Sequence, residues 1–262
     1  MSALIGVSPL ILLVGAGLAI MMVDAFSRER SELALVTAAS LLAGAALAGS
    51  LLVGAEAPVA PDIITRYLAV DRLGLFFDVV VCVGAGLSAL LAGGSLREHG
   101  FVRGEFYVLI VFTAFGAMVL ARAVDLLSIF LGLETMSLGA YAMVAYRRTS
   151  ARAVEAAVKY FLLGSFAAAI LLFGSALLYG ATGHTDLAGI REVVSAGEAD
   201  AVLTVLALVM LIVGLAFKVG AVPFHMWVPD SYEGAATPAT TFMSVGVNAA
   251  AVAVLVRILV GA

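Results

Sequence analysis

Charged residues are scarce in this sequence. Only 12% of the 262 residues are charged, and 63% are hydrophobic, whereas an ordinary soluble domain has roughly 25% charged residues. A soluble fold of this size would need a polar surface around its core, and the residues for that surface are missing. The composition therefore excludes a soluble globular protein.

Ligands for a redox centre are equally scarce. The single cysteine, Cys82, lies inside an apolar run, which excludes an internal disulfide and a cysteine-held iron–sulfur centre. The three histidines do not have the spacing of paired ligands, so neither a haem nor a zinc site is expected. We predict that this chain binds no metal.

Long apolar runs are what the sequence contains instead. Most are about 20 residues long, the length that crosses a hydrocarbon core about 30 Å thick. The predicted fold is all-α, a polytopic transmembrane helix bundle of about eight spans with a broken seventh helix. The spans are Ala3–Val23, Leu33–Gly54, Leu73–Gly94, Phe106–Leu120, Val124–Tyr146, Ala153–Tyr179, Ala201–Val222 and Ala239–Val260. A polar loop, with room for a short interfacial helix, is expected over Gly180–Asp200.

Arginines near the span ends indicate the orientation. With the N-terminus outside, the cytoplasmic segments hold seven arginines: Arg28, Arg30, Arg97, Arg103, Arg147, Arg148 and Arg152. The outer segments hold five: Arg66, Arg72, Arg122, Arg191 and Arg257. Cytoplasmic loops carry the excess of positive charge. The bias predicts an outer N-terminus.

The two lysines are distributed differently from the arginines. Both Lys159 and Lys218 fall within apolar spans, and a buried lysine can lose its proton whereas an arginine keeps it. If the seventh span is unbroken, Lys218 lies near its end and snorkels to the interface. Pro223 favours a break instead, with one helix ending near 218–220 and a second segment over 224–232. Such a break would hold Lys218 in a hydrated cavity.

Other titratable residues accompany these lysines. His225, Asp230 and Glu233 follow the break and form a possible proton relay. Glu134 lies near the middle of the fifth span, where a charge is costly and usually marks an ion or proton path, although it could serve helix packing alone. Lys159 could simply pair with Glu155, four residues earlier on the same helix face.

Three segments resemble a known family. They are "GLETMSLGAYAMVAYRR", "EAAVKYFLLGSFAAAILLFGSALLYGATG" and "FKVGAVPFHMWVPDSYEGAATPATTFMSV". Together they resemble the antiporter-like membrane subunits of respiratory complex I, most closely the subunit N type of NADH-quinone oxidoreductase. The superfamily also contains cation/proton antiporter subunits and membrane-bound hydrogenase subunits.

The resemblance implies both an architecture and roles for single residues. It implies three leading helices over 1–104 and a first five-helix repeat over 105–262, with a second, inverted repeat absent. Glu134 and Lys218 are expected to form an ion pair whose opening and closing moves a proton, and Lys159 matches a further lysine of this subunit type. Asn248 stands where the family usually has a lysine, which puts the onward path from Lys218 in question.

The resemblance also implies a setting for the chain. It would be a subunit of a proton-translocating NADH:quinone oxidoreductase in the bacterial inner membrane. Its partners would be other membrane subunits and the lipid bilayer, with no nucleic acid. This chain would bind no cofactor itself, while partner subunits use NADH and quinone. Two alternatives stay open: a subunit of a multi-subunit sodium/proton antiporter, and a non-conducting truncated scaffold.

Overall fold

The computed structural model describes residues 2–26, 32–54, 59–98 and 104–261. Three of the arginines that indicate the orientation, Arg28, Arg30 and Arg103, lie outside these ranges. Within the ranges, eight helical spans are long and apolar enough to cross a membrane, as predicted. The chain is a multi-pass helical membrane protein.

The helices follow one another with short connections. A short 3₁₀ segment, η1 (Ser2–Val7), leads into the helices α1 (Ser8–Phe26), α2 (Leu33–Val53), α3 (Asp62–Thr65), α4 (Arg72–Glu98), α5 (Glu105–Arg122), α6 (Leu126–Val144), α7 (Ala151–Thr182), α8 (Leu187–Ser195), α9 (Ala201–Lys218) and α10 (Val228–Gly234). The eighth span consists of α11 (Thr237–Phe242), the π-helical segment η2 (Met243–Val247) and α12 (Asn248–Gly261). The π segment ends directly before Asn248, and such segments are frequent at functional sites.

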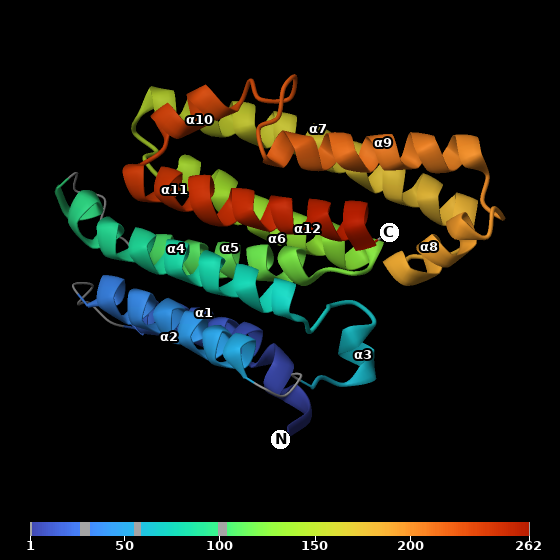
Figure 1. Ribbon diagram of the computed structural model, residues 1–262. Coiled ribbons are helices and arrows are strands. Elements are labelled where there is room, and N and C mark those ends of the chain that lie inside the picture. Colours follow the sequence, from blue (N-terminus) through green and yellow to red (C-terminus); the bar gives the residue numbers. More distant parts are fainter. Residues whose placement is uncertain (1, 27–31, 55–58, 99–103, 262) are drawn as a thin grey trace.

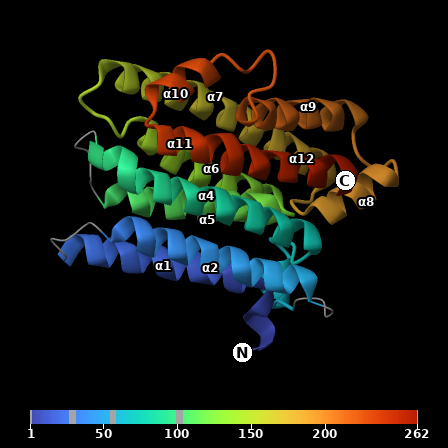
Figure 2. The same cartoon turned by 60° about the vertical axis from the view of Figure 1, so that its left-hand side comes forward.

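The spans form three layers (Figures 1 and 2). Helices α1 and α2 lie on one side, and α4, α5, α6 and the α11–α12 span form the middle layer. Helices α7 and α9, with α10 across the end of α7, form the third layer. The close pairs α2–α4, α5–α6 and α7–α9 are the main helix contacts. The middle layer therefore receives helices on both of its faces.

Polar caps set where several helices begin. The side chains of Asp125, Ser150, Asp186 and Asp200 each accept a hydrogen bond from a backbone N–H in the first turn of the helix that follows. These caps satisfy amides that have no partner within the helix. The cap at Asp125 explains the tight join between the fourth and fifth spans, and Asp186 starts the short helix α8 in the polar loop.

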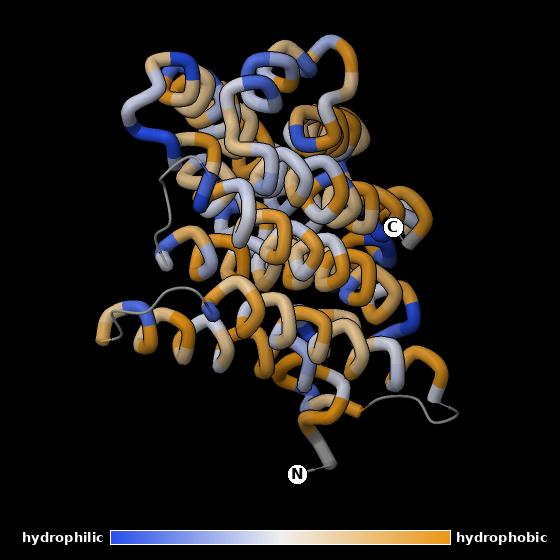
Figure 3. Tube along the Cα trace, turned by 90° about the vertical axis from the view of Figure 1, so that its left-hand side faces the viewer, coloured by the Kyte–Doolittle hydropathy of each residue, from blue (hydrophilic) through white to orange (hydrophobic). Residues whose placement is uncertain are grey.

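The outer surface of the bundle is apolar along its length. On α7 alone, Val158, Phe161, Leu162, Phe166 and Phe173 are exposed. Hydrophobic residues dominate the spans, and hydrophilic residues gather toward the ends and turns (Figure 3). This distribution suits contact with lipid along the spans and with water at their ends.

Candidate functional site

Lys218 lies at the C-terminal end of α9 in an aromatic enclosure. Only 1% of the residue is exposed, so it does not snorkel to the surface. Its Nζ donates a hydrogen bond of 3.3 Å to the Tyr141 hydroxyl. The ring centroids of Tyr141, Tyr160 and Phe217 lie 4.9, 5.1 and 5.6 Å from the same nitrogen. Aromatic faces attract a cation at such distances, so the enclosure suits a charged ammonium group.

The helix that carries Lys218 is broken at the predicted place. Gly220 adopts a left-handed φ of 66°, a conformation that glycine reaches without steric cost. Its N–H donates to Phe217 O (3.1 Å), and the Ala221 N–H donates to Ala216 O (2.9 Å). This hydrogen-bond pair is a Schellman motif and ends α9. The helix thus stops five residues before Pro223, which lies exposed in the turns that follow. The next helix, α10, begins at Val228, four residues later than predicted.

Trp227 closes the break from the other side. Its Nε1–H donates to the Phe217 carbonyl at 2.8 Å, a group at the open end of α9. Its ring stacks on Tyr160 with centroids 4.3 Å apart and an interplanar angle of 10°. Non-helical backbone at membrane depth is tolerated only where protein or water satisfies its polar groups. Trp227 provides part of that satisfaction and packs against Tyr160 and Phe217, two of the rings that surround Lys218.

Glu134 lies on α6, half-buried. Its Oε1 atom is buried and has no hydrogen-bond partner in the part of the chain that the structure describes. The described part of the chain contains no ion pair between Glu134 and Lys218, and the Lys218 nitrogen bonds to the Tyr141 hydroxyl. Lys218 is therefore joined to α6 through Tyr141, seven positions after Glu134 on the same helix.

Lys159 forms two ion pairs on an open surface. The predicted pair with Glu155 is present at 2.7 Å, and a second pair with Asp230 measures 2.8 Å. The Lys159 side chain is 45% exposed. A turn or two away, Arg152 pairs with Glu233 at 2.7 Å, and both side chains are exposed. Asp230 and Glu233 therefore hold α10 against α7.

His225 and Asn248 share a cavity of about 310 Å³ with Val219, Gly220 and Tyr232. Asn248 donates from Nδ2 to Ser244 O (3.3 Å). The cavity adjoins the residues that follow Lys218. It has the size and the polar groups to hold water.

Sequence reasoning missed a group of buried charges at the other end of the bundle. Asp78 of α4 and Arg122 of α5 form an ion pair in which both side chains are fully buried. Arg122 also donates to Gly6 O at 2.7 Å. An acid within an apolar span, Asp78, could have been noticed in the sequence, but its partner Arg122 is 44 positions away. Only the packing of α4 on α5 brings the two together.

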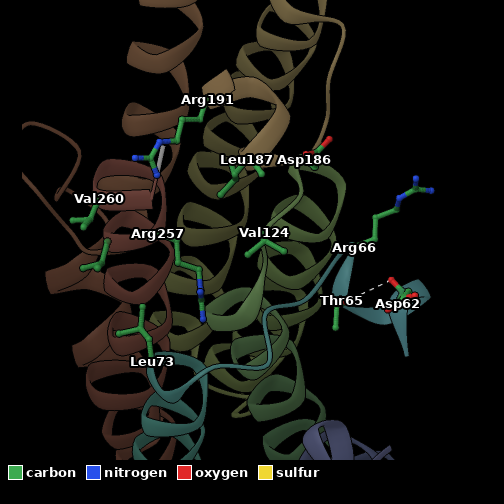
Figure 4. Close-up of a pocket in the computed structure, with 12 residues that line it drawn as sticks. Asp62, Thr65, Arg66, Leu73, Val124, Asp186, Leu187, Arg191, Arg257 and Val260 are labelled. Atoms are coloured by element: carbon green, nitrogen blue, oxygen red, sulfur yellow. Dashed lines mark hydrogen bonds between the residues drawn. The ribbon is translucent and has the colours of Figure 1, made fainter. Parts of the chain in front are cut away.

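A second pair extends this group. Arg257 of α12 donates two hydrogen bonds of 2.8 Å to Asp71, which precedes α4. Burial raises the pKa of the Asp71 carboxyl, but the hydrogen bonds from Arg257 and the Gly74 N–H outweigh it and hold that pKa below its ordinary value. Arg257 also lines a cavity of about 810 Å³, together with Arg191, Leu187 and Val260 (Figure 4). This cavity contains none of the predicted site residues.

No metal centre accompanies these residues. Across residues 2–26, 32–54, 59–98 and 104–261, no cluster of three or more His, Cys, Asp or Glu side chains could hold a metal ion.

Comparison with known proteins places these residues in a family context. Residues 123–262 match the family described as NADH:quinone oxidoreductase/Mrp antiporter, TM. NADH-quinone oxidoreductase subunit N 1 of Sorangium cellulosum is 55% identical over 98% of this chain and 54% of its own length. The chain thus spans about half the length of the curated relatives it matches.

Solved structures of membrane complexes also resemble this chain over most of its length and over about half of theirs. A chain of respiratory complex I from Thermus thermophilus superposes with a TM-score of 0.80 at 33% identity, over 95% of this chain and 52% of that one. A chain of the archaeal membrane-bound sulfane sulfur reductase superposes with a TM-score of 0.82 at 25% identity, over 97% of this chain and 53% of that one.

Proposed function

Because the chain belongs to the NADH:quinone oxidoreductase/Mrp antiporter family of membrane proteins, we propose that it moves protons across the bacterial cell membrane as a subunit of a complex I-type NADH:quinone oxidoreductase. The N-terminus would lie outside. Its first three spans would lead into a five-helix repeat over 105–262 that carries the proton path. NADH oxidation and quinone reduction would take place in partner subunits.

One observation carries this proposal. Lys218 is a fully enclosed ionisable group at the end of a broken membrane helix, and its Nζ is hydrogen-bonded to Tyr141 of α6, the helix that also carries the ionisable group Glu134. Ionisable groups within membrane spans are costly and mark proton and ion paths. A broken helix exposes backbone groups at the same depth, which favours hydration of the path.

The charge on each group would depend on the other. When Lys218 is protonated, the ammonium group stabilises a charged Glu134; when the lysine gives up its proton, the carboxylate loses that support. Movement of a proton between them therefore changes the charge at both positions together. Asn248 and His225 border the cavity beyond Lys218, where water held by the amide would continue the path.

The test is Glu134→Gln in the assembled complex. The substitution keeps the side-chain volume and removes the charge. We expect the number of protons pumped per NADH oxidised in inside-out membrane vesicles to fall, while the amount of complex stays the same. The matched control is Glu192→Gln on α8, an exposed acid outside the spans, which should leave pumping intact. Normal pumping by Glu134→Gln would reduce Glu134 to a packing role.

The family also contains Mrp antiporter subunits, so sodium/proton exchange is the second candidate. It predicts cation exchange without NADH oxidation. The relatives with the highest identities among those compared are NADH-quinone oxidoreductase subunits, which favours the first proposal. Proton movement that requires NADH and stops with an inhibitor of quinone reduction would support it.

A further inference from the structure

The Lys218 ammonium group is enclosed without an acid in contact with it. In the described part of the chain no ion pair reaches Lys218, and the hydrogen bond from its Nζ goes to the neutral Tyr141 hydroxyl. The Glu134 Oε1 atom is buried without a hydrogen-bond partner among the same residues. A charge removed from water costs free energy unless other groups stabilise it. At Lys218 the groups placed to do so are the aromatic rings around it.

Tyr160 of α7 presents its ring, and not its hydroxyl, to the cation. Lys218 Nζ lies over this ring, 5.1 Å from its centroid, whereas the hydroxyl oxygen is buried with no hydrogen-bond partner in the described part of the chain. Trp227 stacks on the ring at 4.3 Å, and the Tyr141 ring meets it edge to face at 4.6 Å. Gly164, also on α7, lies against the Tyr141 hydroxyl, which a Cβ atom there would overlap. Helix α7 therefore fixes the positions of both tyrosines beside the lysine.

We propose that the rings of Tyr141, Tyr160 and Phe217 hold the positive charge of Lys218 more strongly than the Glu134 carboxylate does, and that Tyr160 is a positioning residue of the proton path. The inference rests on the proposed function and adds the groups that decide when the lysine keeps its proton. The face of an aromatic ring is negative and attracts a cation, but it does not accept a proton. Lys218 can then stay charged while Glu134 gains or loses a proton.

The titratable side chains around Lys218 come from three segments. They are Tyr141 of α6, Tyr160 of α7, and His225 and Tyr232 at the cavity that follows the break. Helix α12, which also packs on α9, presents the uncharged Asn248 to that cavity. Tyrosines are neutral at physiological pH, whereas a histidine gains charge in mildly acidic medium. A test of the rings therefore needs His225→Gln as a background that carries no such charge.

The experiment follows the protonation of Lys218 directly. The chain contains two lysines, so isotope labelling of lysine Nζ gives one NMR signal for Lys218 and one for Lys159. The full chain is placed in lipid nanodiscs, and the pH at which half of each Nζ is protonated is measured. The variants are Tyr160→Phe, the same substitution with three fluorine atoms on the ring, and Glu134→Gln, each with and without His225→Gln. Fluorine withdraws electron density from the ring face and barely changes the shape of the ring.

We expect fluorination at position 160 to lower the Lys218 midpoint by about one pH unit, because a desolvated cation loses about that much stabilisation with one ring. The charged form is the one destabilised, so the proton leaves at a lower pH. Tyr160→Phe keeps the ring and should leave the midpoint unchanged. Glu134→Gln should lower it by less than fluorination does, since no contact joins that carboxylate to Nζ. The signal of Lys159, at the surface with Asp230, should not move in any variant.

Each other outcome overturns the inference. If Glu134→Gln lowers the midpoint more than fluorination does, the carboxylate holds the charge. If Tyr160→Phe lowers it as much as the fluorinated ring, the hydroxyl or the packing is responsible. If Lys218 is neutral even in mildly acidic buffer, there is no cation for the rings to hold.

The proposed function is tested separately by Lys218→Met in the assembled complex. Normal pumping by Lys218→Met would overturn the proposed function, whatever the titration shows. Lost pumping by Lys218→Met, with a midpoint that fluorination does not move, would overturn the role of the rings and leave the proposed function standing.

Discussion

Replacement of Arg122 by methionine should strongly destabilise the chain, because it leaves the carboxylate of Asp78 buried without a cation. Both side chains are fully buried. The Arg122 guanidinium donates to Asp78 through Nε and Nη2 and to the Gly6 carbonyl through Nη1. Methionine fills most of the space of the arginine stem and removes all of these donors. Breaking a buried ion pair by removal of one partner costs about 3–5 kcal/mol.

The measurement is the free energy of unfolding of the purified chain in detergent micelles, followed by circular dichroism. Arg152→Met is the control, since its pair with Glu233 is exposed and should contribute less than about 1 kcal/mol. The double variant Arg122→Met/Asp78→Leu removes both charges and should recover most of the loss, since a buried pair is often replaced by apolar residues at little cost. A loss below about 1 kcal/mol in Arg122→Met would refute the reasoning.

Two further predictions concern transport. Lys159→Ala should reduce proton pumping less than Lys218→Ala. Lys159 is half-exposed and pairs with Asp230 and Glu155 at the surface, whereas Lys218 is enclosed. If pumping per assembled complex falls further in Lys159→Ala than in Lys218→Ala, Lys159 lies on the proton path. Asn248→Leu should slow pumping strongly, because leucine removes the amide that lines the cavity beside His225 and that can orient water there. If pumping by Asn248→Leu equals that of the unaltered chain, the path does not leave Lys218 by this cavity.

Much of the fold could be predicted because it depends on local sequence. Each span is a continuous apolar run, and bilayer thickness fixes the length that such a run needs. The break at Lys218 was predictable too, since a lysine, a glycine and a proline fall within six residues of one another. The signal was nevertheless attributed to Pro223, whereas Gly220 forms the motif that ends α9.

The site was less predictable because its contacts join distant parts of the chain. Glu134 and Lys218 could be selected as charges in apolar spans, but nothing in the sequence shows that the Lys218 ammonium group binds Tyr141. That contact depends on the packing of α6 and α9 against α7 and on the room left by Gly164. In the same way, Asp230 looked like a relay for His225, and only the contact of α10 with α7 pairs it with Lys159, 71 positions away.

The ion pairs of α10 should make this end of the bundle sensitive to the salt concentration. The side chains of Lys159–Asp230 and Arg152–Glu233 are exposed, and exposed ion pairs weaken as dissolved salt increases. The segment they fasten also carries Trp227, the lid over the end of α9. Asp78–Arg122, sealed inside the opposite end, is out of reach of such screening. Raised salt should therefore weaken the two pairs that hold α10 against α7 and leave the Asp78–Arg122 pair intact.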